Sequence, residues 1–513
     1  MHFKTRALSL VLLLQVLFLQ TALTQHLPHS IPEKEGVDSK GILDFVNATR
    51  SSKTEFHSFM LLRHGKVIAE AWWNPYAPDL RHTLYSCSKS FTATAIGFAI
   101  NEGKIKLDSK IVSFFPDQAP ASISENLAQL SVRDALIMAD GQDPEPGYII
   151  ADTNWVKGFL AAPIVHKPGT KFLYNSLGTY MLSAIIQKVT GQTLLEYLTP
   201  RLFKPLGIKN ADWETDLKGI NTGGWGLRVK TEDMAKFAQL FLQKGKWKGK
   251  QILPLGWTEE ASSAKIIQHP DMPKARRDAS DSEQGYGYQM WRSKNNAYRG
   301  DGAFGQYMIV MPDQDAVIAI TAETSDMQGE IDLVWKYLLP AMKPDKLPKN
   351  KAAVAELKKT LKELALPPNQ KTSDGFAPDI NGKSYILVNA QSKISNIAFN
   401  FSGDGICKVS LTGDTANYSL SFAAGSWLPS STNKPGPSLT ARAQEVRTML
   451  VPAKVAGSYS WLDDHRLALT LRYIESPHTE KFICEFVGDN ITVKQSNSVE
   501  GARETVFTGK RIN

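Results

Sequence analysis

Along residues 26–342, segments with apolar residues at helical spacing alternate with short segments that have the pattern of strands. Residues 59–73 predict a hairpin that turns at His64-Gly65-Lys66. Residues 88–102 predict a buried helix, because Ala, Phe, Ile and Thr dominate them and Gly103 can cap the helix end. The pattern therefore favours an α/β domain, of α+β type, with an antiparallel sheet.

The rest of this region continues the pattern. Helices are predicted at residues 130–138 and 180–189. Turns are expected at residues 300–305 and 312–314, where Gly, Pro and Asp gather. Three apolar or alternating segments predict consecutive antiparallel strands: 285–291, 306–311 and 316–321.

The composition changes after residue 343, where Lys and Pro become frequent. We expect the first domain to cover residues 26–345, and a linker with a short amphipathic helix at 352–364 to cover residues 346–375. Residues 376–513 predict a small all-β C-terminal domain, because short strand patterns recur between Gly, Asn and Asp. Examples of these strands are 394–401, 467–474 and 481–487.

Residues 1–25 have the pattern of a cleaved secretory signal peptide, in which basic residues precede an apolar stretch and smaller or polar residues follow it. A retained membrane anchor is the alternative, but Gln15 interrupts the apolar stretch and no charged stop-transfer flank follows. We therefore expect a periplasmic or secreted protein with no stable membrane insertion after the signal is removed.

The chain has three cysteines and a net charge of +8. Cys87 lies within a helical pattern, so a disulfide framework does not hold the fold together. Cys407 and Cys484 either pair in an oxidising compartment or remain two unpaired apolar residues. The positive charge is spread along the chain, which argues against nucleic acid as the partner.

Ser86 and Lys89 are three positions apart, a spacing that places both side chains on one face of a helix. Burial would lower the pKa of the lysine, and the neutral amine could then take the serine proton. The apolar helix that follows Ser86 supports this interpretation; the alternative is an N-cap serine with a lysine that reaches solvent. The spacing alone is weak evidence, because it also occurs at Ser262/Lys265 and Ser431/Lys434.

The segment Leu84-Tyr85-Ser86-Cys87-Ser88-Lys89-Ser90-Phe91-Thr92 resembles the nucleophile region of the beta-lactamase-related superfamily, whose signature is Ser-x-x-Lys. This superfamily includes class C beta-lactamases, D-alanyl-D-alanine carboxypeptidases, serine esterases and 6-aminohexanoate-dimer hydrolases. The resemblance covers about residues 33–342. It implies a beta-lactamase-like domain with an antiparallel sheet, flanking helices and a helical subdomain, and it implies that Ser86 is the nucleophile.

A second segment, residues 168–176, resembles the family segment in which a Tyr-x-Asn triplet carries the catalytic tyrosine, which implies this role for Tyr174. A phenolate stabilised by a neighbouring lysine can deprotonate the serine and later protonate the leaving group. The triplet departs from the class C form, because Ser176 stands in the place of its asparagine, and this argues against beta-lactam hydrolysis. Asn175 or Ser176 is expected to orient substrate or Lys89, and the sequence leaves the choice open.

A third segment, Gly300-Asp301-Gly302-Ala303, is similar to the family strand that carries Lys-Thr-Gly or His-x-Gly. The expected cation is missing at Gly300, and strand alternation points Arg299 to the opposite face, so a carboxylate clamp is weakened. The resemblance implies an oxyanion hole of the backbone N–H groups of Ser86 and Ala303, with Gly302 beside the substrate. A plain glycine-rich turn is the alternative. Three aromatic residues either line the cleft or belong to the core: Trp225, Tyr288 and Trp291.

Together these motifs predict an exported serine hydrolase that cleaves an ester or amide, with a beta-lactam or D-Ala peptide among the candidates. The reaction would pass through a Ser86 acyl-enzyme, with Lys89 and Tyr174 as general base and acid. The expected partner is a small-molecule or peptide substrate. Neither a cofactor nor a metal is expected, because the ten histidines are scattered and His-Glu-x-x-His is absent. The alternative is a non-catalytic binding or sensor protein of the cell envelope with the penicillin-recognising fold.

Overall fold

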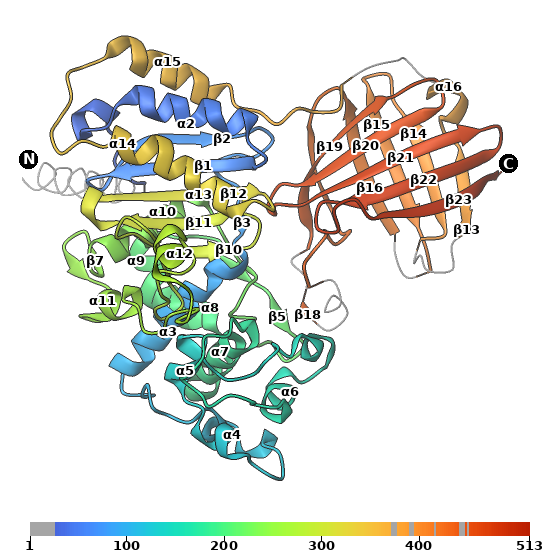
Figure 1. Ribbon diagram of the computed structural model, residues 1–513. Coiled ribbons are helices and arrows are strands. Elements are labelled where there is room, and N and C mark those ends of the chain that lie inside the picture. The colour runs from blue at the N-terminus through green and yellow to red at the C-terminus, as the bar shows by residue number, and fades with distance from the viewer. Residues whose placement is uncertain are drawn as a thin grey trace, which may run out of the picture.

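The computed structural model describes residues 26–370, 377–388, 394–414, 417–440, 447–448 and 451–512. The segment expected to be a signal peptide lies outside the described residues. Figure 1 shows two halves side by side: a mixed half of helices and a sheet, in blue, green and yellow, and a β-barrel in orange and red.

The mixed half is built on one antiparallel sheet of six strands. In order across the sheet these are β2 (Lys66–Trp72), β1 (Glu55–Arg63), β12 (Ala316–Glu323), β11 (Gln306–Met311), β10 (Tyr298–Gly302) and β9 (Trp291–Arg292). Successive residues of β1 face opposite sides, as the period of a strand requires. Phe59 packs in the apolar core on one side of the sheet and Met60 in the core on the other.

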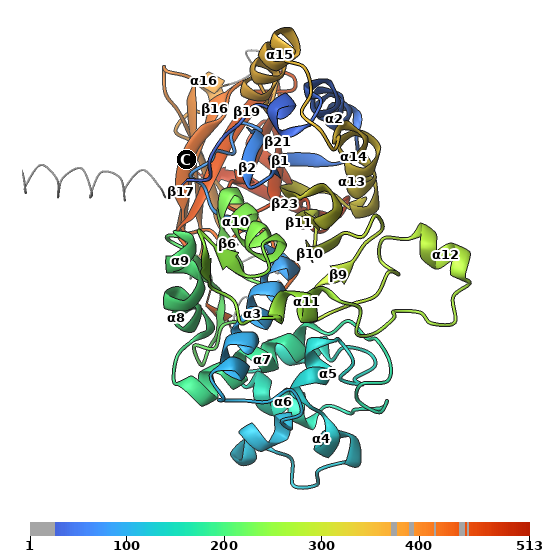
Figure 2. The same cartoon turned by 90° about the vertical axis from the view of Figure 1, so that its left-hand side faces the viewer.

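Helices cover both faces of this sheet (Figure 2). On one face lie α2 (Ser39–Ser51) and α15 (Lys351–Lys362), and on the other lies α10 (Thr231–Leu242). α15 is the helix that the sequence predicts in the linker. Its Leu357 is buried in the core beneath α2, so this helix packs on the sheet of the mixed half.

A helical subdomain lies below the sheet in Figure 1. Its central helix, α7 (Ser176–Thr190), packs against the nucleophile helix α3 (Ser88–Asn101). The other helices of the mixed half are α4 (Glu125–Gln129), α5 (Val132–Leu136), α6 (Trp155–Ala161), α8 (Leu194–Leu198), α9 (Lys204–Leu206), α11 (Trp257–Ser262), α12 (Lys274–Ala279), α13 (Met327–Leu333) and α14 (Leu339–Ala341). Its short strands are β3 (His82–Thr83), β4 (Asp212–Trp213), β5 (Thr215–Asp216), β6 (Leu227–Val229), β7 (Lys246–Trp247) and β8 (Lys250–Gln251).

The structure confirms the hairpin of β1 and β2 and the buried helix α3, and it corrects two predictions. Residues 285–291 were expected to form a strand, but only Trp291 belongs to one. The turn expected at residues 300–305 is shorter, because residues up to Gly302 belong to β10 and only 303–305 turn. Glycine at 302 serves a close approach instead: a Cβ there would lie 2.2 Å from the carbonyl oxygen of Leu84.

The C-terminal half is the expected all-β domain, a sheet of ten strands that closes into a barrel through a pairing of β16 with β19. Its strands are β13 (Ser384–Val388), β14 (Asn396–Phe401), β15 (Ile406–Thr412), β16 (Asn417–Ala424), β17 (Leu428–Thr432), β19 (Ala453–Trp461), β20 (Arg466–Tyr473), β21 (Thr479–Val487), β22 (Asn490–Asn497) and β23 (Glu504–Ile512). Cys407 and Cys484 are buried in this domain as free thiols, which decides between the two alternatives left open by the sequence.

Two of the contacts between the barrel and the mixed half lie in the helical subdomain and next to β3. The short strand β18 (Arg447–Thr448) pairs with β5 of the helical subdomain. The turn between β20 and β21 lies beside β3, where the Thr83 amide donates to the carbonyl oxygen of Glu475 at 2.9 Å. The Glu475 carboxylate is buried and lies 3.1 Å from Arg81 and 3.3 Å from Arg228. The second contact therefore joins the barrel to the strand that leads to Ser86.

Candidate active site

Ser86 lies in a single 3-10 turn, η2 (Tyr85–Cys87), that leads directly into α3. Lys89 is in the first turn of α3 and is 1% exposed, and its Nζ lies 2.9 Å from Ser86 Oγ. Ser86 itself is only half-buried, in contrast to the buried Lys89. The structure thus places the predicted nucleophile and base in direct contact on one side of the helix.

Three oxygen atoms surround the amine of Lys89. Besides Ser86, the Gly224 carbonyl oxygen lies 2.7 Å from Nζ and the Ser176 hydroxyl lies 3.2 Å from it. Burial lowers the pKa of Lys89 to about 7, although Glu145, Cys87 and Asp301 act in the opposite direction. A large fraction of the amine is therefore neutral at physiological pH and able to accept a proton.

Tyr174 lies over this amine, with Lys89 Nζ 4.8 Å from the centroid of its ring. Trp291 stacks on the same ring, at 5.8 Å between centroids and 24° between planes. Burial raises the pKa of Tyr174 far above its ordinary value, and Asp301 and Glu145 act in the same direction, while contact with the Ser86 hydroxyl opposes them. The resting side chain is therefore a phenol, suited to donate a proton, and not the phenolate considered from the sequence.

Asn175 and Ser176, which the sequence left as alternatives, have different places. The Asn175 side chain is buried, its oxygen caps α7 by accepting from the amides of Leu177 and Gly178, and its Nδ2 donates to Gln142 Oε1 at 3.0 Å. Its oxygen is thus committed to the helix cap and its Nδ2 to Gln142, which corrects the expectation that it orients substrate or Lys89. Ser176 is the residue that reaches Lys89.

The end of β10 lies against the turn that carries Ser86. A Cβ at Gly302 would meet the Leu84 carbonyl oxygen and lie 3.3 Å from the Cys87 nitrogen, so this contact requires glycine. Gly302 therefore packs directly on the turn that carries Ser86. The contact places the end of β10 against the residues on either side of Ser86.

The geometry of β10 accounts for the cation missing from the third motif. A Cβ at Gly300 would lie 2.7 Å from Met308 Cε and 3.2 Å from Ser90 Oγ, so this position faces α3 and has no room for a long side chain. Arg299 points the other way, as predicted, and is 3% exposed. Its guanidinium donates to the Asp301 carboxylate at 3.0 Å and to the Ser293 hydroxyl at 2.5 Å. The positive charge of Arg299 is therefore paired with Asp301.

Two groups of the site were not identified from the sequence. The Glu145 carboxylate accepts from the amide of Ser176 at 2.7 Å, at the start of α7, and its field acts on both Lys89 and Tyr174. The Gly224 carbonyl holds the lysine amine. Glu145 and Ser176 are 31 residues apart, and a backbone carbonyl has no sequence signal, so neither group could be identified from local patterns.

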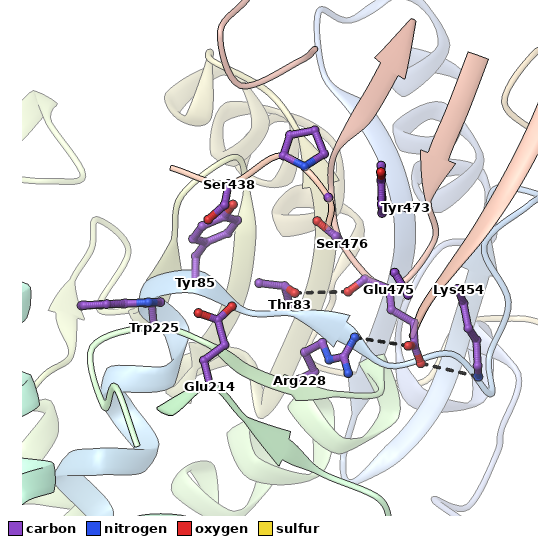
Figure 3. Close-up of a pocket in the computed structure, with 13 residues that line it drawn as sticks. Thr83, Tyr85, Glu214, Trp225, Arg228, Ser438, Lys454, Tyr473, Glu475 and Ser476 are labelled. Carbon is purple, nitrogen blue, oxygen red and sulfur yellow. Dashed lines mark hydrogen bonds and ion pairs between the residues drawn. The ribbon is translucent and has the colours of Figure 1, made fainter. Parts of the chain in front are cut away.

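The structure places the three aromatic residues noted in the sequence, Trp225, Tyr288 and Trp291, in different surroundings. Trp291 stacks on Tyr174, while Tyr288 is 1% exposed and belongs to the core. Trp225 lines a cavity of about 70 Å³ at the junction of the two halves, next to Tyr85. Figure 3 shows this cavity, with Tyr85, Trp225 and Glu214 from the mixed half and Ser438, Lys454 and Tyr473 from the barrel.

The described parts of the chain contain no group of three or more His, Cys, Asp or Glu side chains arranged to hold a metal ion. The chemistry that the site can perform with its own groups is proton transfer and nucleophilic attack by a serine.

Comparison with known proteins identifies the family. Residues 57–339, more than half of the chain, match the family model described as Beta-lactamase. A 6-aminohexanoate-dimer hydrolase of Paenarthrobacter ureafaciens is 26% identical over 291 residues, which cover 52% of this chain and 73% of that protein. A D-aminopeptidase of Brucella anthropi is 28% identical over 169 residues, which cover 30% of this chain and 32% of that protein.

Among solved structures, a putative beta-lactamase from Bacteroides dorei DSM 17855 aligns with a TM-score of 0.50 at 16% identity, over 59% of this chain and 99% of that chain. This likeness concerns the fold alone. The family match extends over the helix of Ser86 and Lys89, the loop of Tyr174 and the strand that ends at Gly302. The chain belongs to the Beta-lactamase family and is a serine hydrolase of that family.

Proposed function

We propose that this protein is an exported enzyme that hydrolyses an ester or amide through an acyl-enzyme on Ser86. The observation that carries the proposal is the environment of Lys89, whose amine lies 2.9 Å from Ser86 Oγ and is otherwise held by uncharged oxygens. The two other lysines with the same spacing from a serine form ion pairs: Lys265 with Glu260 at 2.6 Å and Lys434 with Glu480 at 2.7 Å. The amines of these two lysines thus face a carboxylate, whereas that of Lys89 faces only uncharged oxygens.

In the proposed reaction, Ser86 Oγ attacks the carbonyl carbon of the substrate while its proton passes to Lys89 Nζ. The backbone N–H groups of Ser86 and Ala303 would stabilise the negative oxygen that forms. Tyr174 would then donate a proton to the leaving group and recover one from Lys89. Attack of water on the acyl-enzyme, with the proton transfers reversed, would release the acid product and restore Ser86.

Substrates without a carboxylate near the scissile bond fit this site best. Penicillins and D-Ala peptides need a cation beside the third motif, but Gly300 faces α3 and Arg299 is bound to Asp301. We therefore expect hydrolysis of neutral esters or linear amides to exceed that of a cephalosporin or a D-Ala-D-Ala peptide, measured on a panel of these four substrate types. A cephalosporin as the best substrate would contradict this choice.

The nucleophile is tested with Ser86→Ala, which should abolish turnover of an activated short-chain ester and labelling by a serine-reactive phosphonate. Ser262→Ala is the matched control, because Ser262 has the same spacing to a lysine but lies on α11. The control should keep wild-type activity. Undiminished labelling of Ser86→Ala would refute the assignment. Export is tested separately: the protein recovered from expressing cells should begin near Gln25 or His26.

A further inference from the structure

A histidine of the barrel lies behind the nucleophile turn. His478, on the turn between β20 and β21, is fully buried, and its Nε2 contacts the hydroxyl of Tyr85. Its Nδ1 lies 2.8 Å from Oε1 of Glu323, the last residue of β12. Because a carboxylate can only accept, Nδ1 carries the proton in the neutral ring, and Nε2 is then left to accept from Tyr85.

The same imidazole packs against the turn after β10. The ring of Phe304 meets that of His478 edge to face, at 4.7 Å between centroids and 87° between planes. Phe304 also lies 5.4 Å from the ring of Tyr85, so the three rings form one group. Tyr85 directly precedes Ser86 and Phe304 directly follows Ala303. The group therefore adjoins both residues whose backbone N–H groups would form the oxyanion hole.

Both aromatic neighbours have a backbone conformation that side chains disfavour. Tyr85 has a φ of 46° and Phe304 a φ of 66°, in the left-handed region. Bulky residues remain there only when their surroundings hold them, and such positions gather at functional sites. Here the surroundings include a residue of another domain, 393 positions from Tyr85 in the sequence.

We propose that His478 is a positioning residue of the catalytic centre. Oriented by Glu323, it holds Tyr85 and Phe304, and through them it fixes the backbone N–H groups of Ser86 and Ala303 in the geometry that binds the oxyanion. The barrel thus contributes a residue that positions the catalytic groups. The inference rests on the proposed function, because it assigns His478 to the acyl transfer at Ser86. Misplacing an oxyanion donor by a fraction of an ångström lowers kcat while substrate binding persists.

The test uses two tyrosines that contact the same turn of the barrel. Tyr85→Phe deletes the hydroxyl that contacts His478, and Tyr76→Phe deletes one that donates to the Ser476 carbonyl at 3.1 Å. Each variant loses a hydrogen bond between the domains, but only Tyr85 adjoins Ser86. In the full chain, Tyr85→Phe should lower kcat for an activated ester about tenfold with KM changed less than about twofold, and Tyr76→Phe should leave both unchanged.

Two substitutions of His478 separate its contacts. The polar end of glutamine reaches about where Nε2 lies, and that of asparagine about where Nδ1 lies. His478→Gln can therefore keep the contact with Tyr85, and His478→Asn only that with Glu323. We expect kcat to fall about a hundredfold in His478→Ala, nearly as much in His478→Asn, and clearly less in His478→Gln.

Labelling of Ser86 by a serine-reactive phosphonate should slow in the same order, because this reagent also places an oxygen in the oxyanion hole. If Tyr85→Phe loses no more kcat and labelling rate than Tyr76→Phe, or if glutamine and asparagine at 478 are equivalent, the inference is overturned while the proposed function stands. A wild-type protein that neither hydrolyses any substrate of the panel nor reacts with the phosphonate overturns both.

Discussion

The carbonyl oxygen of Gly224 lies 2.7 Å from Lys89 Nζ, and this contact determines how the amine is oriented. A carbonyl can only accept, so one N–H of Lys89 must point at Gly224. A neutral amine has one further N–H, which the Ser176 hydroxyl at 3.2 Å can accept, and one lone pair. The lone pair is then left for the hydroxyl proton of Ser86. When Lys89 gains that proton, the same three oxygens accept its three N–H groups without rearrangement.

This arrangement predicts the pH dependence of the reaction. The base must be neutral, and burial lowers the pKa of Lys89 to about 7, so kcat/KM should be low in acid and rise with pH through a midpoint near 7. A neutral ester is the substrate to use, because it does not itself titrate. Rates measured between pH 5 and 9 would contradict the assignment if they were constant, or if they fell as the pH rose from 6 to 8.

The Ser176 hydroxyl is predicted to orient the amine of Lys89. In Ser176→Ala the second N–H of Lys89 loses its partner, the amine can rotate, and we expect kcat to fall about tenfold, well short of the loss in Lys89→Ala. Ser183→Ala is the matched control: it lies on the same helix, is buried, and donates to the Asn221 carbonyl at 2.7 Å. The control should lose stability but keep its kcat. Equal kcat in the two variants would argue against a role of Ser176 in catalysis.

The sequence predicted the parts of the fold that depend on local patterns. The hairpin of β1 and β2, the turn at His64-Gly65, and the apolar run of α3 each agree with the structure. β10 was misjudged at its end, because glycines at 300 and 302 suggest a turn when taken alone. They are needed for packing against α3 and the Leu84 carbonyl, a contact between distant segments that no local pattern records.

For the site, the motif residues were identified and the groups that orient them were not. Ser86 and Lys89 share one helix turn, so their contact follows from spacing. The pKa of Tyr174 could not be inferred in this way, because it depends on burial and on two carboxylates from other segments. His478 lies on a domain for which the sequence offered only a fold class, and its place behind Ser86 follows from how the two halves dock.

Asn175 is predicted to stabilise the folded protein. Its side chain caps α7 and donates to Gln142, a residue that is 1% exposed, so Asn175→Ala removes both cap bonds and leaves the buried Oε1 of Gln142 without its donor. We expect a loss of about 2–3 kcal/mol in the free energy of unfolding, measured with urea. Asn154→Ala removes only the cap of the short helix α6 and should cost about 1 kcal/mol. A wild-type unfolding midpoint in Asn175→Ala would contradict the assigned cap.

Glu475 links stability to pH at the junction of the two halves. Burial raises the pKa of this carboxyl, but Arg81 and Arg228 lower it by more, so that the folded protein holds it below its ordinary value. The carboxylate therefore contributes stability above the pKa of the unfolded chain, about 4.3, and this contribution is lost as the pH falls through the lower folded value. Glu475→Gln should reduce stability by about 2 kcal/mol at pH 7, since hydrogen bonds to charged groups are of this size.

The difference between Glu475→Gln and the wild type should shrink as the pH falls below about 4, because the wild-type carboxyl is then protonated as well. The apparent melting temperatures of both proteins between pH 3 and 7 measure this convergence. Glu485→Gln is the control, because Glu485 is exposed on the same barrel and its loss should change the melting temperature little at any pH. A difference that stays constant down to pH 3 would show that Glu475 stabilises the junction by its shape and not by its charge.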